Sequence, residues 1–189
     1  MKKSIIIFLI IGFLQGCVPS AFVAGAAAGG AIIYDHRSAK VMVEDHNITF
    51  QSQKEIDHDK ELHEQAHISV ATFNRIVLLI GQAPNSELRQ RAESIVKANS
   101  NIKMIYNEIT IEKPVSDITS ANDAWITTKV KTVLLTTPGL NSTNLKIVTE
   151  KSVVYLMGLT THTQAQNATD KTRTVAGVKK IVKLFEYLN

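Results

Sequence analysis

The sequence contains a single cysteine, Cys17, and few aromatic residues, with one tryptophan in the whole chain. One cysteine excludes an internal disulfide and excludes the cysteine-rich kind of zinc site. The low aromatic content of 6% argues against a large apolar ligand pocket. The sequence also lacks a nucleophile elbow and a glycine-rich phosphate-binding loop. These absences predict a protein that is not an enzyme and that needs no cofactor.

The first sixteen residues have the features of an export signal. A positively charged start is followed by an apolar run over 4–14 that is too short to span a bilayer. Leu14-Gln-Gly-Cys17 resembles a lipobox, at which the signal is cut before a cysteine that then carries diacylglycerol. We expect a lipoprotein signal peptide and a lipidated Cys17, although an ordinary secretory signal with an accidental cysteine is the alternative. Val18, in place of an aspartate, is typical of lipoproteins sorted to the outer membrane.

Two parts of the chain repeat each other. Residues 68–81 align with 145–158, and each stretch ends in glycine and predicts a β-hairpin. When one residue is dropped, 101–109 aligns with 177–185, which predicts a third strand in each copy. The hairpin turns are expected between runs rich in β-branched residues, at Asn74-Arg75 and Lys151-Ser152.

Helices are expected before and after each hairpin. The helices before the hairpins cover roughly 48–62 and 123–136. Of the helices after the hairpins, that of the first copy is capped by Ser86, and that of the second copy covers 164–174. The order α-β-β-α-β therefore occurs twice. We predict an α+β fold with two tandem domains, each with a small three-stranded sheet packed against two helices.

These patterns divide the chain into five segments. A glycine pair at Gly25 and Gly29 has the spacing of a helix-packing motif in membranes, but the small-residue stretch around it favours a flexible tether. The segments are a signal peptide at 1–16, a lipidated N-terminus and tether at 17–43, a first domain at 44–113, a linker at 114–121 and a second domain at 122–189.

Charge is distributed unevenly between the two domains. The chain has a net charge of +4, but residues 44–113 hold eleven acids against eight bases, whereas residues 122–189 hold four acids against nine bases. The second domain is therefore the better candidate for an acidic partner. Export to the envelope argues against nucleic acid as that partner.

Several segments carry a resemblance to a known family. The hairpin that ends in glycine, the helix after it, and Ala176-Gly-Val178 before the last strand resemble the BON domain, a module of bacterial envelope proteins that bind rather than catalyse. The lipobox and the two units together resemble the dual BON-domain outer-membrane lipoproteins. The further segments that carry this likeness are 77–85, 106–109 and 122–130, of which Trp-Ile-Thr-Thr-Lys-Val within 122–130 is the most specific.

This resemblance implies a function. In that family the second domain binds anionic phospholipids such as phosphatidylglycerol and cardiolipin, and the protein faces the periplasm from the outer membrane, gathers at division sites and supports envelope integrity. The first copy departs from the pattern, because Asn99-Ser-Asn101 replaces the usual Ala-Gly and its early helix has few apolar residues. We therefore expect the first domain to be less regular.

The helix that carries the tryptophan has two distinct sides. At 100° per residue, Ile126, Val130 and Leu134 fall on one side, together with Val133, and should face the hairpin. Tryptophan and leucine on the other side could insert among lipid headgroups, with lysines beside them. The expected phospholipid-binding residues are Trp125, Thr128, Lys129, Lys131, Thr132 and Leu135. The alternatives are that the tryptophan packs within the protein, or that the helix binds envelope proteins as an adaptor or chaperone-like surface.

One motif suggests a different chemistry. His63-Glu64-Gln-Ala-His67 has the spacing of zinc peptidases, in which two histidines one helical turn apart bind the metal. His67, however, runs directly into the first hairpin strand, so the two imidazoles should not share a helical face. We expect these to be solvated loop histidines, with no metal bound.

Overall fold

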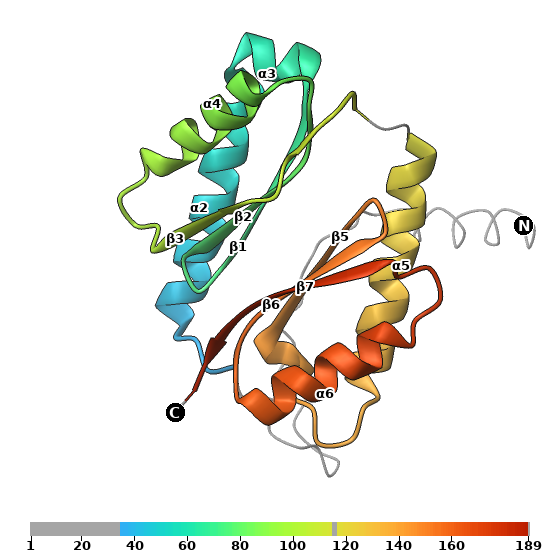
Figure 1. Cartoon of the computed structure of the whole chain (residues 1–189). Helices are drawn as coiled ribbons and strands as arrows, with labels where there is room; N and C mark the ends of the chain where they lie inside the picture. The colour runs from blue at the N-terminus through green and yellow to red at the C-terminus, as the bar shows by residue number, and fades with distance from the viewer. Residues whose placement is uncertain (1–34, 115–116, 189) are drawn as a thin grey trace, which may run out of the picture. The chain divides into compact units, whose positions relative to one another are not determined.

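The computed structural model describes residues 35–114 and 117–188, which form two copies of one α/β unit (Figure 1). Cys17, the predicted signal peptide and most of the predicted tether lie outside the described residues. Among the residues that are described, no helix has the length and apolar character needed to cross a membrane.

The first copy holds the predicted elements and two short additional ones. Its elements are α2 (Ala39–His58), α3 (Lys60–Gln65), β1 (His67–Phe73), β2 (Ile76–Ala83), α4 (Ser86–Lys97), β3 (Met104–Asn107) and β4 (Thr110–Ile111). β1 and β2 are antiparallel, and β3 and β4 both pair with β2 in parallel.

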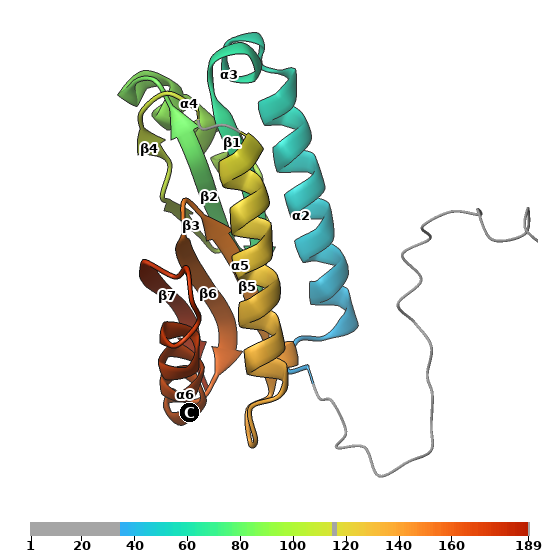
Figure 2. The same cartoon turned by 90° about the vertical axis from the view of Figure 1, so that its right-hand side faces the viewer.

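The second copy follows the same plan, and α5 runs along the hairpin of its own domain (Figure 2). Its elements are α5 (Asp117–Leu135), the short 3-10 helix η2 (Ser142–Asn144), β5 (Leu145–Glu150), β6 (Val153–Thr160), α6 (His162–Arg173) and β7 (Lys180–Tyr187). The sheet order is β5-β6-β7, with β7 parallel to β6. The predicted α+β fold with two tandem units is confirmed.

Three local boundaries differ from those expected. α2 begins at Ala39, so residues 39–43 of the expected tether are helical, and α5 begins at Asp117, within the expected linker. The cap of α4 is Asn85 rather than Ser86, because the Asn85 backbone is extended and its side chain accepts the Leu88 N–H at 2.9 Å. Two adjacent polar residues can each cap a helix, and the backbone conformation selects the first.

The two hairpin turns lie where the sequence predicts them, and each is held by a buried aspartate. All four turn residues have positive φ, between 50° and 64°, which suits two-residue hairpin turns but is uncommon for residues other than glycine. Asp45 of α2 accepts the N–H groups of Asn74 and Arg75, both at 2.7 Å. Asp123 of α5 accepts those of Lys151 and Ser152 at 2.6 and 2.8 Å. A carboxylate therefore fixes the first helix of each unit to its hairpin.

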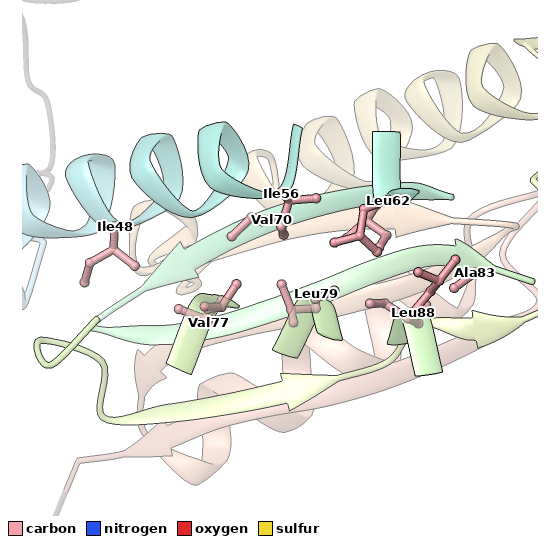
Figure 3. Packing of buried hydrophobic residues seen from close by; sticks show 12 residues of the cluster. Ile48, Ile56, Leu62, Val70, Val77, Leu79, Ala83 and Leu88 are labelled. Carbon is pink, nitrogen blue, oxygen red and sulfur yellow. The ribbon is translucent and has the colours of Figure 1, made fainter. Parts of the chain in front are cut away.

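Helices cover one face of each sheet. In the first domain, side chains of α2, α3 and α4 meet the alternate residues of β1 and β2 that point toward them (Figure 3). α2 contributes only Ile48 and Ile56 to this core, as its low apolar content predicts. The irregularity of this domain lies in its third strand, which breaks between β3 and β4 opposite Gly81. Gly81 has φ of 119°, and a Cβ there would lie 1.9 Å from the His67 carbonyl oxygen.

The other faces of the two sheets are also buried, and they share one apolar cluster, which we call the interface cluster. It is formed by Ala71, Phe73, Ile76, Leu78 and Ile80 of the first domain and Tyr155, Met157 and Leu184 of the second. A sheet buried on both faces requires a continuous apolar run instead of an alternating one, and the run over Ile76–Ile80 has that form. The Gln82 amide also donates to the Glu150 carboxylate at 2.5 Å. The two domains therefore depend on each other for burial.

Tyr155 provides a measurable reporter of this cluster. Burial, with a smaller contribution from the carboxylates of Glu108 and Glu150, raises the pKa of Tyr155 to about 12. Because the folded pKa exceeds the ordinary value of 10.0, the associated stability is complete below pH 10 and is lost as pH rises toward 12. We expect an absorbance titration of tyrosine ionisation to show one late step at about 12 that Tyr155→Phe removes. A titration unchanged by that substitution would contradict this placement of the side chain.

Candidate functional site

The inner side of α5 fixes how this helix is rotated. Ile126, Val130 and Leu134 are fully buried, and Val133 packs against the same core, as the helical pattern predicts. These side chains contact Ala168 of α6 and the inward residues of the hairpin. Their burial leaves the opposite side of the helix to solvent.

The outer side of α5 exposes two large apolar side chains. Trp125 is 61% exposed and Leu135 is 69% exposed, and the exposed residues Thr128 and Thr132 lie between them. Both threonine hydroxyls donate to carbonyls of their own helix, at 2.9 and 3.0 Å. Because these hydroxyls are already bonded, the surface between the two apolar residues is largely methyl in character. We call Trp125, Thr128, Thr132 and Leu135 the Trp face.

Lys129 lies at the edge of the Trp face. Its amine lies 5.8 Å from the centre of the Trp125 ring and donates to the Ala176 carbonyl at 2.5 Å. The next residue, Gly177, has φ of 100°, and a Cβ there would lie 3.1 Å from the Ile126 side chain. Close approach of this loop to α5 therefore requires glycine. An ammonium group has three donors, so Lys129 keeps two for another acceptor.

The predicted binding residues do not all lie together. Lys131 is exposed, but it lines a cavity with residues of α2 and β5 and lies away from Trp125. The helix turn explains the separation, because six residues correspond to about 240° of rotation at 100° each. The structure therefore groups Lys129 with the Trp face and Lys131 with a second location.

The Trp face carries no acidic side chain within the described part of α5. From residue 119 to the end of the helix the one acid is Asp123, which is 5% exposed and accepts the two N–H groups of the hairpin turn. An anionic partner would therefore meet an amine and an indole at this surface without an opposing carboxylate from the helix.

The histidine motif has no helical geometry. α3 ends at Gln65, and His67 is the first residue of β1, so His63 and His67 lie on either side of a helix–strand junction. Across residues 35–114 and 117–188, no group of three or more histidine, cysteine or acidic residues is placed to hold a metal ion.

Two features were not found from the sequence. The paired aspartates have a sequence signal, since Asp45 lies 29 residues before Asn74 and Asp123 lies 28 residues before Lys151. The cavity lined by Lys131 has no such signal, because it is formed by segments of both domains that lie far apart in the sequence.

Comparison with known proteins assigns the family. The model of the BON domain matches residues 44–113 and again 122–189. The "Outer membrane lipoprotein DolP" of Haemophilus influenzae is 31% identical over 189 residues, which is 100% of this chain and 97% of that protein. The "21 kDa hemolysin" of Actinobacillus pleuropneumoniae is 34% identical over 154 residues, covering 82% of this chain and 79% of that protein.

Among solved structures, the C-terminal domain of CdsD, a structural protein of the type III secretion system of Chlamydia trachomatis, has a TM-score of 0.32 and 11% identity. That match covers 72% of this chain and 96% of that one, and so weak a likeness carries no argument. The two matches to the BON model and the full-length identity to a lipoprotein relative agree with the repeat seen in the fold. The chain belongs to the BON-domain proteins and, among them, to the DolP family of dual BON-domain outer membrane lipoproteins.

Proposed function

We propose that this protein is anchored by lipid at Cys17 in the outer membrane, faces the periplasm, and binds anionic phospholipid through the Trp face of its second BON domain. The observation that carries the proposal is the exposure of Trp125 and Leu135, both above 60%, on one side of α5. Indole rings favour the headgroup region of a bilayer, and a leucine beside the indole adds apolar area that the membrane can bury.

Charge adds to this attraction. The Lys129 amine lies beside the indole, and a lysine near an anionic membrane surface contributes about 1 kcal/mol. The second domain has the excess of bases, with nine against four acids in residues 122–189. Insertion and charge together favour phosphatidylglycerol or cardiolipin over uncharged lipid.

Because of the proposed lipid anchor, a low intrinsic affinity of the Trp face for phospholipid would be sufficient for binding. About 20 residues separate Cys17 from the first residue of α2, and a chain of that length spans at most about 70 Å. Both domains would therefore stay near the membrane, which raises the effective concentration of the Trp face at the lipid surface. The role in the cell that we propose is support of outer-membrane integrity, with enrichment at division sites and without catalysis, as the family resemblance implies.

The proposal can be tested with the mature full-length chain carrying Cys17→Ser, which removes the anchor. The full chain is needed because the second domain alone would expose its half of the interface cluster. Trp125 is the one tryptophan, so its emission reports directly on the site. We expect a blue shift with vesicles of phosphatidylcholine plus phosphatidylglycerol or cardiolipin, and no shift with phosphatidylcholine alone.

Salt separates the two components of binding. The Debye length falls from about 10 Å at ~0.1 M salt to about 3 Å at ~1 M, so high salt should weaken the shift. An absence of any shift with every vesicle would overturn the proposal. It would leave Cys17 as the membrane contact and favour the alternative in which the Trp face binds an envelope protein.

A further inference from the structure

A cavity of about 430 Å³ lies where α2 and β1 of the first domain meet α5 and β5 of the second. Three basic side chains line it: Arg37, Lys131 and Lys146. The volume falls in the range of small-molecule sites, and the walls include apolar side chains of β1 and β5. The cavity lies apart from the Trp face.

Two of these cations form no ion pair with any acid that the structure describes. The Lys146 amine donates to the Thr72 carbonyl at 3.1 Å, and within the described residues neither Lys146 nor Lys131 forms an ion pair. Burial lowers the pKa of Lys146; Asp45 opposes this shift, and Arg37 and Lys131 add to it. A half-buried amine beside other cations is stabilised when an anion compensates for the lost hydration.

The acids at the cavity are already engaged. Asp45 accepts the two N–H groups of the first hairpin turn and pairs with Arg37 at 2.8 Å. Arg37 also pairs with Asp35 at 2.9 Å and stacks over the Phe73 ring, with its guanidinium carbon 3.9 Å from the ring centre. Even when Asp35, which pairs with Arg37 but does not line the cavity, is counted with Asp45, the three cations leave a net charge of +1.

An independent observation points to the same place. Thr72 is 2% exposed, and in the part of the chain that the structure describes its hydroxyl is the buried side-chain group without a hydrogen-bond partner. The same residue lines the cavity and holds the Lys146 amine through its carbonyl. Native proteins bond nearly all buried polar groups, so a buried hydroxyl without a partner, beside two amines that form no ion pair, points to a site for an acceptor.

We propose that this cavity between the two BON domains is an anion site that takes a phosphate group, held by the amines of Lys131 and Lys146 and the hydroxyl of Thr72. A phosphate offers several acceptor oxygens to separate donors, and charge-assisted bonds of this kind are strong. The net charge of +1 suits a phosphodiester. The cavity is larger than one phosphate, so the group can belong to a lipid headgroup or to a soluble compound. The site does not depend on lipid binding by the Trp face.

The test is calorimetric titration of the mature full-length chain carrying Cys17→Ser. One arm uses inorganic phosphate, and the other uses dihexanoyl phosphatidylglycerol below its micelle concentration. Lys146→Met removes the amine but keeps most of the length of the side chain, and Thr72→Val keeps its shape without the hydroxyl. We expect each variant to weaken binding about tenfold or more, as loss of a hydrogen bond to a charged group implies.

A matched control is Lys183→Met, which removes one exposed lysine of β7 outside this cavity and should leave the dissociation constant unchanged. Thr72→Val should fold at least as well as the parent, because it deletes an unsatisfied buried hydroxyl. Loss of binding in this variant therefore cannot be attributed to unfolding. Trp125→Glu should also leave this binding intact, which separates the cavity from the function proposed above.

Each result has a defined meaning. Binding in both arms, weakened by both cavity variants, supports recognition of the phosphate group itself. Binding confined to one arm and weakened by the same variants supports the site and identifies the lipid headgroup or the soluble compound as its source. Binding in neither arm, or binding that Lys146→Met and Thr72→Val leave unchanged, overturns the proposal.

Discussion

Trp125→Glu is expected to lower the partitioning of the full-length chain onto anionic vesicles by about a hundredfold. Burial of a large apolar side chain contributes about 2 kcal/mol, and an added carboxylate is repelled by about 1 kcal/mol at the anionic surface. Their sum of about 3 kcal/mol corresponds to a factor of about 100. Because this substitution removes the fluorophore, the measurement is co-sedimentation with vesicles. Leu135→Glu should act in the same direction, since that side chain is 69% exposed on the same face.

The chain provides a matched control for this substitution. Phe50 of α2 is 63% exposed, so Phe50→Glu adds the same charge at an equally exposed aromatic position in the first domain. We expect Phe50→Glu to leave vesicle binding nearly unchanged and Trp125→Phe to retain most of it. If Phe50→Glu weakened binding as much as Trp125→Glu, net charge would be responsible and the Trp face would not be the site.

Substitutions of Lys129 and Lys131 should have different effects. Lys129 lies beside the indole, whereas Lys131 lines the cavity between the domains. Lys129→Met should therefore weaken vesicle binding and reduce its salt dependence, while Lys131→Met should affect the phosphate titration more than the vesicles. The helical pattern already separates Lys131 from Trp125, but only the structure shows that Lys131 lines a cavity with residues of the first domain.

The parts of the fold that follow from local patterns were predictable from the sequence. The hairpin turns were placed correctly, because strand alternation and turn position depend on neighbouring residues. A third strand lies in the predicted region of each unit, but in the first unit it is broken into β3 and β4. The inner face of α5 was correct for the same reason, since a period of 3.6 residues fixes which side chains share a side. The cap of α4 was wrong by one residue, because Asn85 and Ser86 are both suitable caps.

The parts that depend on distant contacts were not predictable. The apolar run over Ile76–Ile80 indicates a strand buried on both faces, but nothing in it identifies Tyr155 and Met157 as what covers the second face. Cavity residues such as Thr72 and Lys146 look like ordinary strand positions until the two domains are placed together. Asp45 and Asp123 repeat at nearly the same distance before the two hairpin turns, but this spacing acquires a meaning only when each is seen at its turn.

Asp123→Ala is expected to lower the free energy of unfolding by about 3 kcal/mol, measured by urea or thermal denaturation of the full chain. Asp123 is 5% exposed, and its carboxylate accepts the N–H groups of Lys151 and Ser152. Alanine would leave two backbone donors unsatisfied at about 1–3 kcal/mol each, partly offset by water entering the turn. The same turn holds two non-glycine residues at positive φ, and this strained backbone can relax once the carboxylate is gone.

Two further variants separate the hydrogen bonds of Asp123 from its charge. Asp123→Asn keeps one acceptor oxygen and should show about half of the loss, because only one of the two N–H groups then lacks a partner. Asp170→Ala removes an exposed acid of α6 whose partners, Arg173 and Gln166, both lie within its own helix, so stability should change by less than about 0.5 kcal/mol. A loss in Asp123→Ala no larger than that in Asp170→Ala would show that the turn holds its own conformation. The buried carboxylate would then not be what fixes α5, and with it the Trp face, to the hairpin.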